Sequence, residues 1–287
     1  MYNRFFQFAG ISMRIESEKP LEIVDYFTIF EKKDEKRPHV IYKIKKIESP
    51  IVFEEKAIFQ NERMKVYLVE GMEYRQFPWW TENENYPMTL KCGDMDTVPL
   101  RYELLLTKPQ IEMFAKRFHF AGCLALERVM LQYDTFQLHA SIIEIDGKGI
   151  LFTAPSGTGK STQASLWEKY ENAVIINGDK TMIQKRKGDF WGCGSPYAGT
   201  SKIYRDLAVP IHSIVVLAKG KENKLTRLSK SQAFMYIYRE AAVNIWNENF
   251  MTRFAGLLEE LVCKVPVYHF ACLPDKSAVE VLKNTLF

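Results

Sequence analysis

Ala154-Pro155-Ser156-Gly157-Thr158-Gly159-Lys160-Ser161 is the segment from which the architecture of this chain can be derived. Its spacing matches the phosphate-binding P-loop, with Ala154 at the position that usually holds the first glycine. The flanks also match: residues 149–153 form a short apolar run typical of a buried strand, and residues 162–170 lack proline and glycine, as a helix does. A strand, a glycine-rich turn and a helix in this order are the context that the motif requires.

This segment offers the groups that a polyphosphate and its metal ion need. Successive backbone N–H groups and the helix N-terminus form a nest for phosphate oxygens, and Gly157 and Gly159 permit the close approach that a side chain would block. Lys160 can reach the β- and γ-phosphates, and Ser161 can offer its hydroxyl to Mg²⁺. The sequence therefore predicts a nucleoside triphosphate site formed by Ser156, Gly157, Thr158, Gly159, Lys160, Ser161 and Thr162.

Composition excludes several other classes of protein. The 287 residues hold no apolar run of about 20 residues, so no transmembrane helix is expected, and the N-terminal residues do not resemble a signal peptide. The 39 basic and 35 acidic residues are interspersed, which argues against nucleic acid as a partner. The five cysteines lack C-x-x-C spacing and indicate reduced thiols. We therefore expect a cytoplasmic protein with no membrane partner; a homo-oligomer is left open.

The pattern of apolar residues divides the chain into two parts. Residues 1–109 are β-rich, with alternating apolar and polar residues at 11–15, 40–44 and 64–68 and a further strand at 100–107. From Gln110 to Val129 apolar residues recur at a spacing of three to four, which predicts one helix. We therefore predict a β-rich N-terminal region over 1–109 and a P-loop domain over 110–287.

The P-loop domain alternates strands and helices and is predicted to be of the α/β class. Strands are expected at 137–145, 149–153, 173–176, 182–184, 190–192, 213–218, 225–228 and 266–273. Helices are expected at 162–170, 234–245, 254–261 and 275–286. Tight turns are expected at Asp146-Gly147 and at 186–189, and residues 192–202, rich in glycine and hydroxyl groups, are expected to form a loop.

Two further residues are candidates for chemistry beside the nucleotide. Asp179 directly follows the strand at 173–176, where a carboxylate can hold the metal ion or accept a proton. Asn177-Gly178-Asp179 is also good turn chemistry, so a purely structural role is the alternative. His139 lies on the strand before the P-loop strand, and the sequence leaves open whether it is a site residue or a packed one.

These residues together resemble a known group of enzymes. His139-Ala140-Ser141, the hairpin, the P-loop and Gly178-Asp179 are similar to the catalytic domain of HPr kinase/phosphorylase and the nucleotide-binding half of phosphoenolpyruvate carboxykinase. This chain resembles more closely the smaller bacterial kinases of this lineage, some of which phosphorylate free serine or serine in ribosomally made peptide precursors. The resemblance covers about Gln137 to Ala218 and leaves residues 1–109 unexplained.

The resemblance implies a function and a role for each residue. Lys160 and Ser161 would bind phosphate and Mg²⁺, Asp179 would be a base or metal ligand, and His139 would line the phosphate site. The chain departs from the family pattern at Gly178, where the family has a second acid, and it lacks the substrate domain of a carboxykinase. We therefore expect an ATP- and Mg²⁺-dependent serine kinase. A regulatory ATPase without a phosphorylated acceptor and a carboxykinase-like enzyme of small molecules are the alternatives.

The expected acceptor is a peptide, a protein or a small molecule that carries a hydroxyl group. Because the P-loop half accounts for nucleotide and metal, residues 1–109 and the loop at 192–202 are expected to contribute the acceptor-binding surface. Trp79, Trp80 and Lys202 are the residues through which this expectation can be tested. The alternative is that residues 1–109 cover an otherwise exposed sheet.

Overall fold

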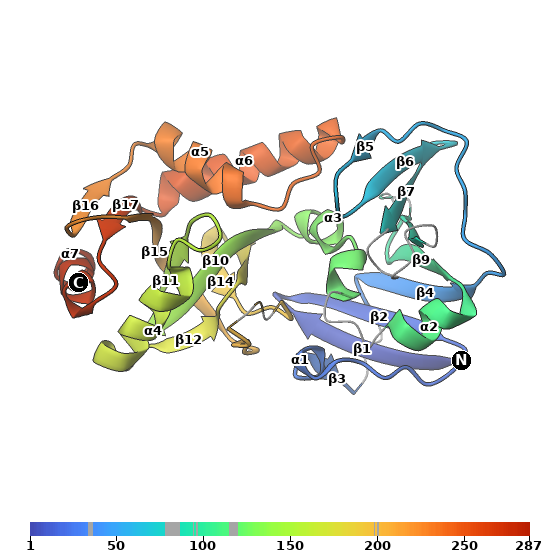
Figure 1. Ribbon diagram of the computed structural model, residues 1–287, viewed down its shortest axis with the longest axis horizontal. Helices are drawn as coiled ribbons and strands as arrows, with labels where there is room; N and C mark the ends of the chain where they lie inside the picture. The colour runs from blue at the N-terminus through green and yellow to red at the C-terminus, as the bar shows by residue number, and fades with distance from the viewer. Residues whose placement is uncertain are drawn as a thin grey trace. The chain divides into compact units, whose positions relative to one another are not determined.

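The computed structural model describes residues 1–33, 37–77, 87–93, 95, 97–114, 120–197, 199 and 201–287. The chain divides into two compact units, Met1–Val129 and Met130–Phe287, and each contains a large sheet (Figure 1). The division lies after Val129 rather than after residue 109. The aromatic residues Trp79 and Trp80 lie outside the described residues.

The first unit is built on a nine-stranded sheet of order β3-β1-β2-β4-β9-β8-β7-β6-β5. Its elements are β1 (Tyr2–Phe8), β2 (Ile11–Ser17), α1 (Asp25–Thr28), β3 (Glu31–Lys32), β4 (Val40–Lys46), β5 (Phe59–Gln60), β6 (Lys65–Val69), β7 (Met72–Phe77), β8 (Met88–Lys91), β9 (Leu100–Leu106) and α2 (Lys108–Phe114). The four strands expected from the sequence lie in β2, β4, β6 and β9, which confirms that this region is β-rich.

The single helix predicted for residues 110–129 is wrong. Helix α2 ends at Phe114, a 3-10 turn follows at Phe120–Cys123, and α3 (Leu126–Leu131) begins after Ala125, whose positive φ of 48° does not fit an α-helix. Ala121, Cys123 and Leu124 are at most 1% exposed, whereas Gly122 between them is exposed. Buried residues in an irregular segment can therefore follow a helix-like apolar spacing without forming a continuous helix.

The second unit holds the P-loop segment in an eight-stranded sheet of order β11-β10-β13-β14-β15-β17-β16, with β12 paired to β10 and β11 paired also to β15. Its strands are β10 (Thr135–Ile145), β11 (Lys148–Thr153), β12 (Val174–Asn177), β13 (Lys180–Arg186), β14 (Asp189–Cys193), β15 (Ala208–Lys219), β16 (Lys224–Arg227) and β17 (Val267–Cys272). Its helices after α3 are α4 (Lys160–Glu171), α5 (Lys230–Glu240), α6 (Glu248–Lys264) and α7 (Lys276–Leu286).

Strand β10 organises this sheet because its two halves have different partners. Residues 135–139 pair with β13, whereas residues 140–145 pair with β11, and both pairings are antiparallel. The turn from β10 to β11 has positive φ at Asp146 and Gly147 (51° and 74°), as expected for a two-residue hairpin. The pairing therefore brings the end of β11, where the P-loop begins, beside the middle of β10.

Helices cover both faces of the sheet (Figure 1). Neighbouring residues of a strand point to opposite faces, and so Ile142 joins the apolar cluster that contains Phe254 of α6. Ile143 joins the cluster that contains Trp167 of α4 and Leu282 of α7. The P-loop helix is thus fixed on one face, and α5 and α6 lie on the other. No helix in the described part of the chain is long and apolar enough to cross a membrane.

Helix α5 ends earlier than the sequence predicted. The expected apolar face ran to Ile245, but the helix ends at Glu240, and Ile245 is 58% exposed. Ala241 is extended and forms an isolated β-bridge with Leu138 of β10, and the N–H of Ala242 donates to the carbonyl of Gln137 (3.0 Å). Pairing with a strand about a hundred residues away therefore terminates the helix.

Candidate phosphate-binding and catalytic site

The P-loop segment connects β11 to α4 and leaves the first turn of the helix open to a ligand. Gly157 and Gly159 have positive φ values of 76° and 119°, which favour glycine. Gly159 is the N-cap of α4, and no side chain caps its free N–H groups. An uncapped helix N-terminus at a glycine turn is the geometry that binds an anion.

Lys160, the first residue of α4, is held against this loop. Its side chain is buried, and its Nζ donates to the carbonyls of Ala154 (2.7 Å) and Pro155 (3.3 Å). Burial lowers the pKa of Lys160, while the charges of Glu240 and Asp179 act in the opposite direction. A partly desolvated ammonium group at an uncapped helix N-terminus can stabilise a bound polyphosphate.

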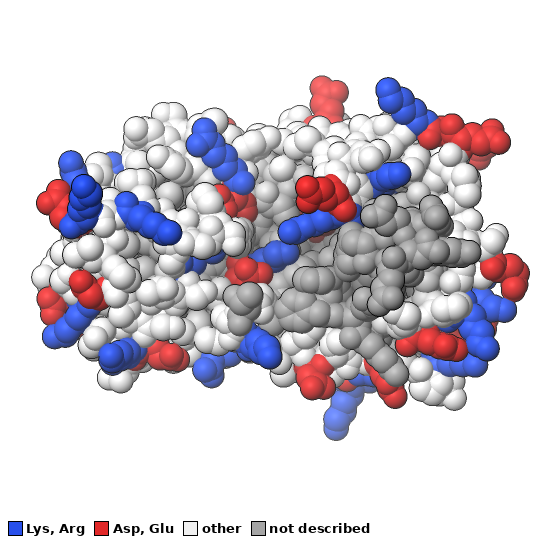
Figure 2. Space-filling model, viewed as in Figure 1, with Lys and Arg blue, Asp and Glu red and all other residues white. Residues whose placement is uncertain are grey.

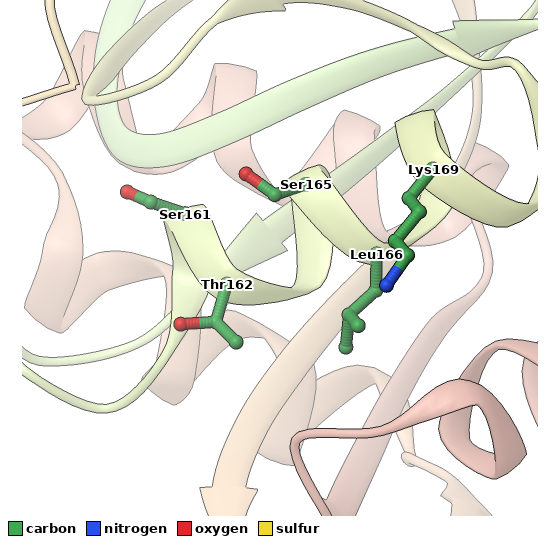
Figure 3. A pocket seen from close by; sticks show the side chains of 5 residues that line it. All are labelled: Ser161, Thr162, Ser165, Leu166 and Lys169. Carbon is green, nitrogen blue, oxygen red and sulfur yellow. The ribbon is translucent and has the colours of Figure 1, made fainter.

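A hollow of about 420 Å³ runs along the exposed side of α4 from the predicted site residues Ser161 and Thr162 (Figure 3). Ser165, Leu166 and Lys169 complete its lining. Figure 3 shows the hydroxyls of Ser161 and Ser165 extending in the same direction from successive turns. Ser161, Ser165 and Lys169 are four residues apart and therefore lie on one face of the helix. This spacing could have identified Ser165 and Lys169 from the sequence as neighbours of Ser161.

Asp179 lies in a turn that a buried asparagine organises. The Oδ1 atom of Asn177 accepts hydrogen bonds from the backbone N–H groups of Asp179 (2.9 Å) and Lys180 (2.8 Å). Its Nδ2 group donates to the carbonyls of Ser195 (3.1 Å) and Tyr197 (3.2 Å). The Asn177-Gly178-Asp179 segment is thus a turn, and it lies beside the P-loop segment, where the carbonyl of Gly178 is 3.5 Å from Oγ of Ser161. A structural role and a site role for Asp179 both remain consistent with this geometry. No pattern in the sequence had marked Asn177 for this role.

The loop after β14 lies directly against this turn. The N–H of Gly178 donates to the carbonyl of Ile203 (3.1 Å). A Cβ atom at Gly178 would lie 2.0 Å from the Oγ of Ser201, and one at Gly199 would lie 2.5 Å from the Cβ of Asp179. Position 178 therefore has no space for the acidic side chain that the family pattern places there. Gly199 of the loop at 192–202, which was expected to contribute to acceptor binding, is therefore adjacent to Asp179, and Lys202 of the same loop is exposed.

His139 is placed between two carboxylates. Its Nε2 lies 3.6 Å from Oδ1 of Asp179, and its Nδ1 lies 3.2 Å from Oε2 of Glu240. The side chains of His139 and Asp179 are 29% and 28% exposed, and that of Glu240 is 15% exposed. Glu240 was not predicted as a site residue, because the sequence predicted a helix over 234–245 with Glu240 in its interior. No pattern in the sequence indicated the β-bridge that ends α5 at Glu240.

The charges around Asp179 favour its ionised form. Burial raises the pKa of Asp179, but its interaction with His139 and the positive charges of Lys180 and Lys160 outweigh that effect, so the pKa lies below its ordinary value. An ionised carboxylate at this position can accept a hydrogen bond from a hydroxyl group or bind a cation.

The predicted metal residues form a partial donor set for Mg²⁺. The Oγ of Ser161 lies 3.5 Å from the carbonyl of Gly178, the residue before Asp179, so the two predicted ligands come from adjacent segments. The described residues contain no group of three or more histidine, cysteine or acidic side chains arranged to bind a metal ion. Mg²⁺ at nucleotide sites is commonly held by one or two protein groups together with phosphate oxygens and water, which one hydroxyl and one carboxylate fit.

The fold and the motif define a mixed α/β protein with two large sheets, one of which carries a P-loop-like strand, turn and helix. The family model described as SynChlorMet cassette protein ScmC matches residues 119–272, and the chain belongs to this family. No curated protein matches the chain.

Several solved structures are similar to part of the chain. Among them is the "Hpr(Ser) kinase/phosphatase from Coxiella burnetii", which is 14% identical over 52% of this chain and 94% of that chain, with a TM-score of 0.31. A likeness this weak says nothing about activity.

Proposed function

We propose that this protein is an ATP- and Mg²⁺-dependent phosphotransferase that phosphorylates the hydroxyl group of a serine in a peptide, a protein or a free amino acid. One observation carries the proposal. An uncapped helix N-terminus with its buried lysine shares one site with an ionised aspartate and a histidine from neighbouring strands. This combination supplies both a place for the phosphates and a carboxylate for the acceptor.

The residues of the P-loop segment would hold the triphosphate. The free N–H groups of the first turn of α4 and the ammonium group of Lys160 stabilise negative charge on the transferring phosphoryl group. Mg²⁺, when bound at Ser161 and Asp179, supplies further charge neutralisation. The exposed hollow beside Ser161 and Thr162 offers space for the rest of the nucleotide.

Asp179 would act on the acceptor. Its carboxylate orients the hydroxyl group and accepts its proton as the hydroxyl oxygen forms a bond to the γ-phosphorus. The bond between that phosphorus and the β,γ-bridging oxygen breaks, and ADP leaves. Positioning and charge stabilisation account for most of the rate in such reactions. The loop that packs on Asp179 through Gly199 and Ser201 would then contribute to the choice of acceptor.

The family description suggests where an acceptor can be sought. It names a cassette protein, so we propose that another product of the same cassette, or a metabolite made by it, carries the hydroxyl group. Basic and acidic side chains are both present on the face of the second unit in Figure 2. A role for residues 1–109 in acceptor binding stays a prediction.

The test follows labelled phosphate from [γ-³²P]ATP in the presence of Mg²⁺. The full chain is incubated separately with free serine, with a serine-containing peptide and with each peptide encoded in the cassette. Label in one of these acceptors, absent when Lys160 is replaced by alanine, is the expected result. Label only in inorganic phosphate would favour the regulatory ATPase. No release of label under any condition would contradict the proposal.

A further inference from the structure

The last residue of α5 brings a second carboxylate to the site from a part of the chain that the P-loop motif does not include. Glu240 Oε2 lies 3.2 Å from Nδ1 of His139, closer than the 3.6 Å between Nε2 and Asp179. The Glu240 side chain is also the least exposed of the three, at 15%. The shorter and better buried contact makes Glu240 the stronger determinant of the orientation of the ring.

Helix α5, which carries Glu240 as its last residue, is held in place at both of its ends. Helix α5 begins with a capping box in which Ser229 and Gln232 each engage the backbone N–H of the other. It ends where Ala241 bridges Leu138, the residue directly before His139. A residue fixed between a helix end and a β-bridge has little freedom to leave the imidazole, unlike a carboxylate on a surface loop.

The contact between Glu240 and Nδ1 affects the orientation of the His139 imidazole. A neutral imidazole donates from one nitrogen only, and it can donate to both carboxylates only when both nitrogens are protonated. A carboxylate in contact with Nδ1 restricts rotation of the ring and so fixes where Nε2 lies relative to Asp179. Two lysines lie near these groups: Lys180, which is paired with His139 on β13, and Lys160 at the start of α4, whose charge acts on Glu240 and Asp179.

We infer that Glu240 is a positioning residue of the phosphotransfer site, which acts through His139 to hold Asp179 in the orientation that the acceptor hydroxyl requires. The inference rests on the proposed function, because it assigns a role within that reaction. It adds to the site a carboxylate that lies outside the P-loop, the following strand and the hairpin, and no motif in the sequence marked it.

A double-mutant cycle tests whether Glu240 acts through His139. Glu240→Ala should lower kcat by about 10- to 100-fold, the usual loss when a partner that orients a histidine is removed, with little change in KM for ATP. Glu240→Gln retains an acceptor oxygen and should keep more activity. In a His139→Ala background, Glu240→Ala should cost nothing further. The exposed Glu248, replaced by alanine, is the control and should leave kcat unchanged.

Two kinetic results would overturn the inference. The first is a loss of kcat in the double variant equal to the product of the two single losses, and the second is an equal loss of kcat for Glu240→Ala and Glu240→Gln. A wild-type protein inactive with every acceptor would instead count against the proposed function. The contact is then tested without turnover, by the ¹⁵N chemical shifts of the His139 imidazole, assigned among the five histidines with His139→Ala. Glu240→Ala should move these shifts and Glu248→Ala should not; unchanged shifts in Glu240→Ala would refute the positioning role.

Discussion

Replacing Gly178 by alanine tests whether the turn before Asp179 and the loop after β14 are packed as one unit. The added Cβ would lie 2.0 Å from Oγ and 2.7 Å from Cβ of Ser201. To reach an ordinary contact distance the two segments must separate by about 1 Å or more. Overpacking of this kind typically costs about 1–3 kcal/mol of the free energy of unfolding.

The same displacement should reduce activity, because Asp179 is the next residue in the chain. A misplacement of about 1 Å in a catalytic group can lower turnover by about 100-fold. Stability is measured by urea denaturation of the full chain, and activity by phosphate transfer or ATP hydrolysis. We expect Gly178→Ala to be less stable and less active than wild type. The loss of stability is expected whether or not the proposed function is correct.

A second variant and a control make this prediction specific. Ser201→Gly removes both atoms that the new Cβ would meet, so adding it to Gly178→Ala should restore most of the lost stability. Gly256 of α6 has no atom within 4 Å of its would-be Cβ, and Gly256→Ala should raise stability by up to about 1 kcal/mol. Wild-type stability in Gly178→Ala, or failure of Ser201→Gly to rescue it, would refute the packing described for this loop.

Two further predictions concern the same site, and a third concerns the start of α5. Asp179→Asn should retain ATP binding, measured by calorimetry, while turnover falls by at least about 100-fold; a loss of only a few-fold would make Asp179 a turn residue. Because the pKa of Asp179 is lowered, its ionised form stabilises the fold above the unfolded pKa of about 4, and this contribution is lost as the pH falls through the lower folded value. Asp179→Asn should therefore be less stable than wild type in urea at pH 7, and the difference should vanish in strong acid. Ser229→Ala removes a capping hydroxyl from α5 and should cost about 1 kcal/mol of unfolding free energy, whereas an unchanged urea midpoint would contradict the capping box.

Local patterns in the sequence predicted most of the second unit. The P-loop segment and its flanks became β11, the turn and α4, and Asp146-Gly147 formed the hairpin between β10 and β11. These elements depend on turn chemistry and on apolar periodicity over a few residues, which a single sequence contains. The alternating strands of the first unit were predicted for the same reason.

Long-range contacts account for the features that the sequence did not reveal. A 3-10 turn at Phe120–Cys123, followed by Leu124 whose carbonyl accepts a hydrogen bond from the Tyr42 hydroxyl, interrupts what looked like one helix. The bridge between Leu138 and Ala241 ends α5 at Glu240. The role of Asn177 depends on Ser195 and Tyr197 in a loop. All three features depend on contacts between segments far apart in the sequence. Local apolar periodicity carries no information about such contacts.

The central claim, that the loop at 154–161 holds a nucleoside triphosphate, is tested most directly by the stability that ATP and Mg²⁺ confer. At a hundred times its Kd, ATP should add about 2.7 kcal/mol to the free energy of unfolding of the wild-type chain. Lys160→Ala, which removes a charge worth about 2.7–4 kcal/mol in comparable transition states, should lose most of this gain and all turnover, while the exposed Lys219→Ala should keep both. Wild-type stabilisation and turnover in Lys160→Ala would contradict the claim.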